Sequence, residues 1–259
     1  MLSNLRYLKI FCSGDLSSVW GLSEFLFANP RLEHLSLDVG EARCVDLSES
    51  HPQSTLPFLR TLCIRVRVAY DWFQTLLETI DAPAVESLCL SCQDDGFEPL
   101  VDFFCTGRVN GSLCPRLSTT EPAPSRPGCG PLFPTLRHLH LDGINMSKGS
   151  WEQLLKAYSM ITEITPDWDA LTALTKSKVA LPNLSHIRHS TGLPRLHLAE
   201  FLRKNVQSSP IRLSIARRGM PEQMDRKRDN LTRILHGLVD RVEVYDEEDG
   251  FAIEPDSMF

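Results

Sequence analysis

The chain has 259 residues, of which 42% are hydrophobic and 23% are charged. This balance can bury a core, so it excludes a disordered chain. No uncharged apolar stretch approaches the roughly 18 residues that span a bilayer, and Arg6 and Lys9 interrupt the first apolar segment, which excludes a signal peptide there. We therefore expect a folded protein without a membrane partner.

The net charge of −6 is concentrated at the C-terminal end. Residues 240–259 hold eight acidic side chains against Arg241, so the remainder of the chain is nearly neutral. A neutral body offers no broad cationic surface for phosphates, and nucleic acid is not an expected partner. The last segment, 246–259, is interpreted as an acidic tail. Several of the eight cysteines lie in apolar runs rather than in a compact cystine scaffold, which favours a reduced cytoplasmic or nuclear compartment.

A short phrase with leucine-like residues at its first, fourth and sixth positions recurs along the chain. Its clearest copies are 5–10, 32–37, 59–64, 85–90 and 136–141, and weaker copies begin at 161, 184, near 210 and at 239. The starting positions are 23 to 29 residues apart, except for one interval of 51. A proline that fixes φ often precedes the phrase by two residues. These prolines are Pro30, Pro57, Pro83, Pro134 and Pro182.

Helical patterns lie between the phrases. Segment 71–80 opens with an aspartate and carries an apolar stripe, and segment 150–158 begins with a capping box of Ser150 and Gln153. Similar stripes occupy 16–28, 98–105, 196–206 and 222–238. Strand and helix alternating at this period predict an α/β leucine-rich-repeat-like solenoid, a horseshoe arc with parallel strands on the concave side and helices on the convex side. The competing interpretation, an ordinary doubly wound domain, lacks its Gly-rich phosphate loop here.

We expect a single irregular domain over residues 1–259. The longest interval contains a Pro/Gly-rich insertion at 106–133, with five prolines and four glycines. Such a composition does not sustain helix or sheet hydrogen bonding, so the insertion is predicted to be a disordered loop that splits one repeat. The alternative is a proline-rich ligand for another protein.

The P-x-L-[RE]-x-L-x-[LI] phrases, the long intervening helices and the acidic end resemble the leucine-rich-repeat region of fungal F-box proteins. The resemblance covers nearly the whole chain and implies a substrate receptor of a cullin-type ubiquitin ligase. In that family an F-box binds a Skp-type adaptor, and no part of this sequence resembles an F-box. The consensus asparagine after each strand is also replaced, for example by Gly40 and Gln93, which predicts an irregular arc.

Strand alternation predicts which side chains line the concave face. They form one row of Tyr7, His34, Thr61, Ser87, His138, Glu163 and His186, and a second row of Lys9, Ser36, Cys63, Cys89, His140, Thr165 and Arg188. The residues proposed to bind a protein substrate are Tyr7, Lys9, His34, Asp38, Arg65, His138, His140, Asp142, His186 and Arg188.

Neither catalysis nor a cofactor is indicated by a sequence motif. We find no metalloprotease or hydrolase signature and no nucleophile with an adjacent base. Cys89 and Cys92 have zinc-like spacing, but strand alternation places them on opposite faces, which argues against a shared metal. The leading hypothesis is a non-enzymatic protein-binding module. A repeat scaffold unrelated to ubiquitin is the alternative, and a zinc protein or metalloenzyme is less favoured.

Overall fold

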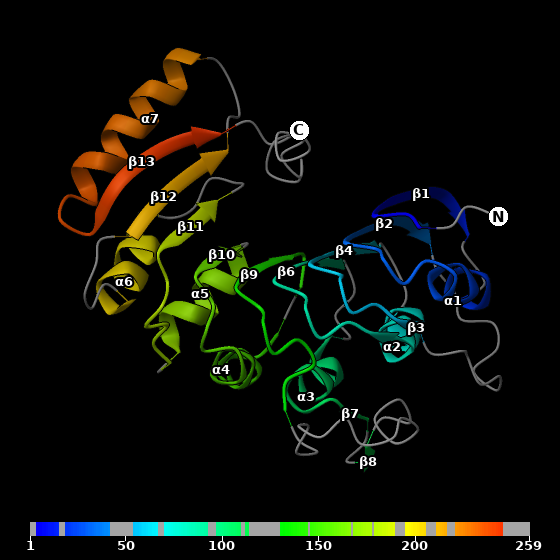
Figure 1. The fold of residues 1–259 in the computed structure, drawn as a ribbon. Helices are drawn as coiled ribbons and strands as arrows, with labels where there is room; N and C mark the ends of the chain where they lie inside the picture. Colours follow the sequence, from blue (N-terminus) through cyan, green and yellow to red (C-terminus); the bar gives the residue numbers. More distant parts are fainter. Residues whose placement is uncertain are drawn as a thin grey trace.

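The computed structural model describes residues 4–15, 19–41, 54–66, 70–92, 97–109, 112–113, 130–144, 146–166, 168–177, 179–189, 195–205, 211–216 and 221–245. Nine strands form one parallel sheet in which the strand order follows the sequence (Figure 1). These strands are β1 (Tyr7–Asp15), β2 (His34–Glu41), β4 (Thr61–Val66), β6 (Ser87–Cys92), β9 (His138–Asp142), β10 (Glu163–Pro166), β11 (His186–His189), β12 (Ile211–Ala216) and β13 (Val239–Tyr245). Every repeated phrase leads into a strand or lies within one, and the predicted parallel order is confirmed.

The helices follow one another along one side of the sheet (Figure 1). They are α1 (Val19–Phe27), α2 (Tyr70–Thr79), α3 (Glu98–Thr106), α4 (Lys148–Ala157), α5 (Trp168–Lys176), α6 (Arg195–Asn205) and α7 (Pro221–Ile234). Helices α3 to α7 pack in sequence order, and α1 packs on α2. The sheet face opposite the helices is called the open face below.

One helix, α5, is not predicted from the sequence. It lies in the shortest interval between phrases, and Ala170, Leu171 and Leu174 are the buried hydrophobic residues in its described part, 170–176. Nine residues with so narrow a stripe give a weak periodic signal. The helix is nevertheless fixed by its neighbours, because α4 and α6 pack on either side of it.

A repeated turn leads into the strands. In three examples, Leu32 N donates to Asn29 O at 3.2 Å, Leu59 N to Leu56 O at 3.1 Å, and Leu184 N to Leu181 O at 3.1 Å. Pro30, Pro57 and Pro182 follow the accepting residue in each case, at the turn position where a fixed φ near −65° is favoured. The recurrent proline therefore shapes the entry to the strand, in addition to ending the preceding helix.

A second hydrogen-bond pattern joins each repeat to the next. The carbonyl of the residue before a strand accepts from two successive backbone N–H groups of the following repeat. Arg6 O, for example, accepts from Glu33 N at 2.8 Å and from His34 N at 2.9 Å, and Glu33 O accepts from Arg60 N at 2.8 Å. The same pattern continues from Arg60, Glu86, Arg137 and Thr162. The alignment of neighbouring strands is thus fixed before each strand begins.

The repeated leucine-like positions form the core, as predicted. Leu35, Leu62, Leu88, Leu139 and Ile164 occupy the middle position of successive phrases, and all are buried between the sheet and the helices. The first phrase is different, because Leu5, Leu8 and Ile10 are only partly buried. Their strand, β1, is at the edge of the sheet and has a neighbour on one side only.

Two buried asparagines tie helix ends to the preceding repeat. Asn29 accepts from Leu5 N at 3.3 Å and donates to Phe25 O at 2.9 Å. Asn205 makes the same pair of bonds, accepting from Leu181 N at 2.9 Å and donating to Phe201 O at 2.9 Å. Each side chain satisfies a backbone donor 24 residues earlier and a carbonyl of its own helix. These asparagines lie at the ends of helices, whereas the consensus asparagine expected from the sequence follows a strand.

Two local predictions need correction. Helix α4 begins earlier than expected, because its N-cap is Ser147, whose hydroxyl accepts from Ser150 N at 3.2 Å. Ser150 therefore lies inside the helix, and the capping box at Ser150 and Gln153 is wrong. An earlier serine with equal capping ability simply takes the position.

The insertion also departs from expectation at its two ends. Strands β7 (Arg108–Val109) and β8 (Ser112–Leu113) pair antiparallel, so this part does sustain sheet hydrogen bonds. At the other end Leu132 N donates to Phe104 O at 2.8 Å, and Phe133 is buried in the core. Residues 114–129 and the acidic segment 246–259 lie outside the described residues.

Candidate functional site on the open face

Side chains on the open face form three rows, in which the members are register partners on successive strands. The first row is Tyr7, His34, Thr61, Ser87, His138, Glu163, His186 and Arg212. The second is Lys9, Ser36, Cys63, Cys89, His140 and Thr165, and the third is Phe11, Asp38, Arg65, Ser91 and Asp142. The two rows predicted from strand alternation are therefore adjacent in the sheet as expected, except that no register pair joins Arg188 to Thr165 in the described strands.

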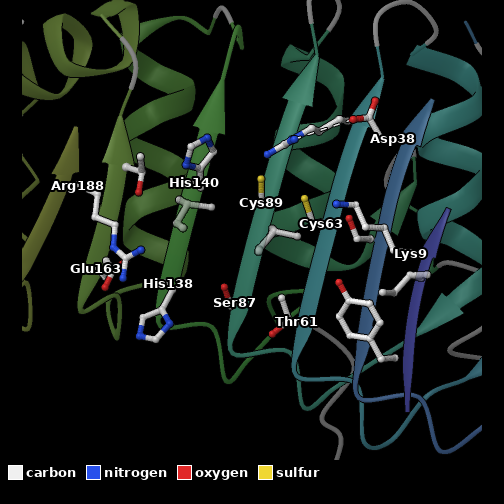
Figure 2. Close-up of a pocket in the computed structure, with 17 residues that line it drawn as sticks. Lys9, Asp38, Thr61, Cys63, Ser87, Cys89, His138, His140, Glu163 and Arg188 are labelled. Atoms are coloured by element: carbon white, nitrogen blue, oxygen red, sulfur yellow. Dashed lines mark ion pairs between the residues drawn. The ribbon is translucent and has the colours of Figure 1, made fainter. Parts of the chain in front are cut away.

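A hollow of about 300 Å³ lies over the middle of this face (Figure 2). It spans strands β1 to β11, and its lining includes seven of the ten residues expected to bind a partner. These are Tyr7, Lys9, Asp38, Arg65, His138, His140 and Arg188. The hollow also includes Cys63, Cys89 and Glu163, which were not among the expected binding residues. The sequence does place these three residues in the two predicted rows, which is the pattern that could have identified them as lining residues.

Three expected residues do not line this hollow. His34 is partly buried beside Tyr7, with ring centroids 6.1 Å apart, and its Nδ1 is buried without a hydrogen-bond partner among the described residues. Asp142 accepts from the Ser91 hydroxyl at 3.3 Å. His186 lies with His138 beside a second, more polar hollow of about 280 Å³ that Arg212 and Asp240 also line.

Some of the charged side chains in the central hollow lie close to a side chain of opposite charge. Arg65 Nη1 lies 4.0 Å from Asp38 Oδ2, and both side chains remain more than one-third exposed. Burial lowers the pKa of His140 to about 4, with Arg65 and Arg188 adding to the effect and Asp142 opposing it. At neutral pH His140 is therefore an uncharged imidazole that offers a donor and an acceptor.

Glu163 lies at the centre of a network that the sequence did not predict. Its Oε2 is 2.9 Å from His186 Nδ1, its Oε1 is 2.8 Å from Arg188 Nε, and His186 Nε2 is 2.7 Å from the Ser214 hydroxyl. Burial alone would raise the pKa of Glu163, but the contacts with His186 and Arg188 outweigh it and lower the pKa. The expectation of no nucleophile beside a base is wrong. The Ser214 hydroxyl contacts the His186 ring, and the other nitrogen of that ring contacts the Glu163 carboxylate.

The surroundings of Ser214 differ from those of a catalytic serine. The residue is only 4% exposed, so a substrate carbonyl has little access to its hydroxyl. Strand β12 also lies between β11 and β13, and its backbone N–H groups are engaged in those two ladders. An acyl-transfer site requires free donors aimed at the developing oxyanion. The network instead orients Glu163 and Arg188 at the edge of the central hollow.

The two cysteines with the spacing of zinc ligands lie on opposite faces of the sheet. Cys89 belongs to the second row of the open face, whereas Cys92 packs in the core cluster on the helix side. Among the described residues, no group of three or more histidine, cysteine or acidic side chains has the geometry of a metal site.

Comparison with known protein families and with curated proteins finds no match for this chain. Within the described residues, no helix combines the length and apolar character needed to cross a lipid bilayer.

Proposed function

We propose that this protein is a leucine-rich-repeat-type solenoid that binds a protein partner on its open face. The observation that carries the proposal is the continuous polar surface made by three in-register rows of side chains on successive parallel strands. The turn and carbonyl patterns repeated in successive units support a solenoid, in which each repeat contacts its neighbours. Solenoids of this kind curve, and the strand side becomes an extended concave binding surface.

The chemistry of the face suits a folded protein surface. Exposed aromatic rings of Tyr7 and Phe11 lie at one end, and charges of both signs lie across the middle. Aromatic anchors supply contact area, and mixed charges give specificity through complementary groups on the partner. A shallow surface spanning several strands is also wider than a site for one small substrate.

We infer further that the partner is a protein presented for ubiquitination. Support comes from the resemblance of the repeated phrases to fungal F-box proteins, in which the Skp-type adaptor contacts the F-box and the repeats hold the substrate. A repeat scaffold outside the ubiquitin system is the alternative. The coding sequence upstream of Met1 distinguishes them, because an F-box encoded there supports the ligase and its absence from a complete transcript supports the scaffold.

The binding proposal predicts that open-face variants lose partner capture without losing stability. Tyr7→Ala, Lys9→Glu and His138→Ala each change an exposed side chain, and the matched control is Lys156→Glu, an exposed cation on α4. Quantitative pull-down should show about tenfold less of the same partner for the open-face variants, with the thermal midpoint nearly unchanged. Arg188→Glu is a poor choice, because it would place a second carboxylate against Glu163. Equal capture by all four variants would place the binding surface elsewhere.

The contacts of Ser214 with His186 and of His186 with Glu163 make a serine hydrolase the second candidate to test. We expect the protein not to act in this way, since Ser214 is buried and the backbone N–H groups of β12 are engaged in the ladders with β11 and β13. Incubation with a fluorophosphonate probe should leave Ser214 unlabelled, while a known serine hydrolase in the same tube is labelled. An adduct on Ser214 that disappears in both Ser214→Ala and His186→Ala would establish the hydrolase instead.

A further inference from the structure

Two thiols face one another at the bottom of the central hollow. Cys63 and Cys89 are register partners on the adjacent strands β4 and β6, and both line the hollow. Figure 2 shows their sulfur atoms side by side on neighbouring strands. The two side chains are hydrogen-bonded to each other, and Arg65, two residues along β4, acts on both thiols. Neither thiol takes part in the network around Glu163, and neither is among the residues expected to contact a partner.

The surroundings make the two sulfur atoms unequal. The hydrogen bond from Cys89 lowers the pKa of Cys63 to about 7, and Arg65 and a bond with Ser36 act in the same direction against burial. The same hydrogen bond, together with burial, raises the pKa of Cys89. At neutral pH a substantial fraction of Cys63 is therefore thiolate, whereas Cys89 stays a protonated thiol. A thiolate beside a cation is the reactive form of cysteine.

The spacing of the strands permits the two sulfurs to bond. Register partners on neighbouring strands have their Cα atoms about 4.8 Å apart. Disulfides form over Cα separations of about 4.4 to 6.8 Å. Both residues are mostly buried, but the hollow that they line gives a small reagent a path to the sulfur atoms.

We propose that Cys63 and Cys89 form an oxidisable dithiol site whose reactant is a hydroperoxide and whose product is a disulfide across β4 and β6. The Cys63 thiolate attacks one oxygen of the hydroperoxide, the O–O bond breaks, and the other oxygen takes up a proton and leaves as an alcohol or water. Cys63 is then a sulfenic acid. The Cys89 thiol attacks its sulfur, the S–O bond breaks, and the hydroxide leaves as water with the proton from Cys89. The two thiols lose two electrons, and the hydroperoxide gains them.

The chain contains its own unreactive reference. Burial and the nearby Asp102 raise the pKa of Cys105 to about 12, so this thiol is protonated at neutral pH. Cys92 is a second reference, because it packs in the core rather than lining the hollow. Trypsin separates the residues usefully, since Cys63 falls in the peptide 61–65 and Cys89, Cys92 and Cys105 fall together in the peptide 68–108.

The first test is the rate of alkylation by iodoacetamide in native buffer at pH 7, followed by peptide mass spectrometry. Cys63 should react more than about tenfold faster than Cys105 and Cys92. In denaturant the three rates should become similar. Equal native rates, or a faster Cys105, would overturn the assignment of Cys63 as the reactive thiol.

The second test is treatment of the reduced protein with hydrogen peroxide. Peptide 61–65 should become disulfide-linked to peptide 68–108, with fragmentation placing the bond on Cys89. Cys89→Ser should form no such link and should instead accumulate a sulfenic acid on Cys63 that dimedone traps, while Cys105→Ser should behave as wild type. Cys63→Ser should lose both products, and the unchanged circular dichroism of each variant excludes unfolding. Oxidation spread evenly over the cysteines, or a link through Cys92 or Cys105, would overturn the proposal.

Discussion

Replacing Leu62 with alanine is expected to lower the free energy of unfolding by about 2 to 5 kcal/mol. Leu62 is fully buried between β4 and the helices, and truncation leaves a cavity that close-packed neighbours fill only in part. The neighbouring residue Thr61 lies on the open face and is partly exposed. Thr61→Ala should therefore cost less than about 0.5 kcal/mol.

The two variants are compared in urea titrations followed by circular dichroism. The two residues are adjacent on one strand. A difference between their losses of stability therefore shows which face of the strand is buried, and it does not reflect a general tolerance of β4 to substitution. The slope of the transition should be unchanged for Thr61→Ala. Equal losses of stability would mean that the core and open faces have been assigned the wrong way round.

His140 is expected to make the protein less stable in mild acid. Burial lowers its pKa from an ordinary 6.5 to about 4, so the unfolded chain binds this proton at a higher pH than the folded chain. Stability from this group is complete above pH 6.5 and is lost as the pH falls from 6.5 to 4. Between pH 7.5 and pH 5 the expected loss is about 2 kcal/mol.

The measurement is the free energy of unfolding in urea at several pH values. His140→Gln should remove most of this loss, because glutamine does not titrate. His138→Gln is the matched control, since it changes an exposed histidine two residues away and leaves His140 in place. His34, whose pKa is also lowered mainly by burial, supplies a smaller part of the same trend. An unchanged pH dependence in His140→Gln would contradict the burial of this imidazole.

Much of the sheet could be predicted because each strand is indicated by a short stretch of neighbouring residues. A leucine phrase at a steady interval indicates a strand, and alternation within the phrase indicates which side chains face the helices. The same alternation correctly aligned Cys63 with Cys89 and His138 with Glu163. What it could not provide was the contact of His186 with Ser214, which belong to different rows and meet only through their side-chain rotamers.

Other features could not be predicted because their sequence signals were ambiguous or weak. Ser147 and Ser150 can both cap a helix, and in the structure Ser147 is the N-cap while Ser150 lies in the first turn of α4. Helix α5 gave too few apolar positions to be recognised, although its neighbours hold it in place. Asn29 and Asn205 act at the ends of helices, whereas the repeat consensus places an asparagine after each strand.

Strand alignment is independent of chain length between repeats. Ser87 and His138 are register partners although 51 residues separate them, and Thr61 and Ser87 are partners across 26. The Glu86 carbonyl that accepts from Arg137 N and His138 N fixes the alignment at the entry to β9. The register of the open face is therefore kept across an interval about twice as long as its neighbour. Repeats can acquire new peripheral segments without redesigning the surface that they share.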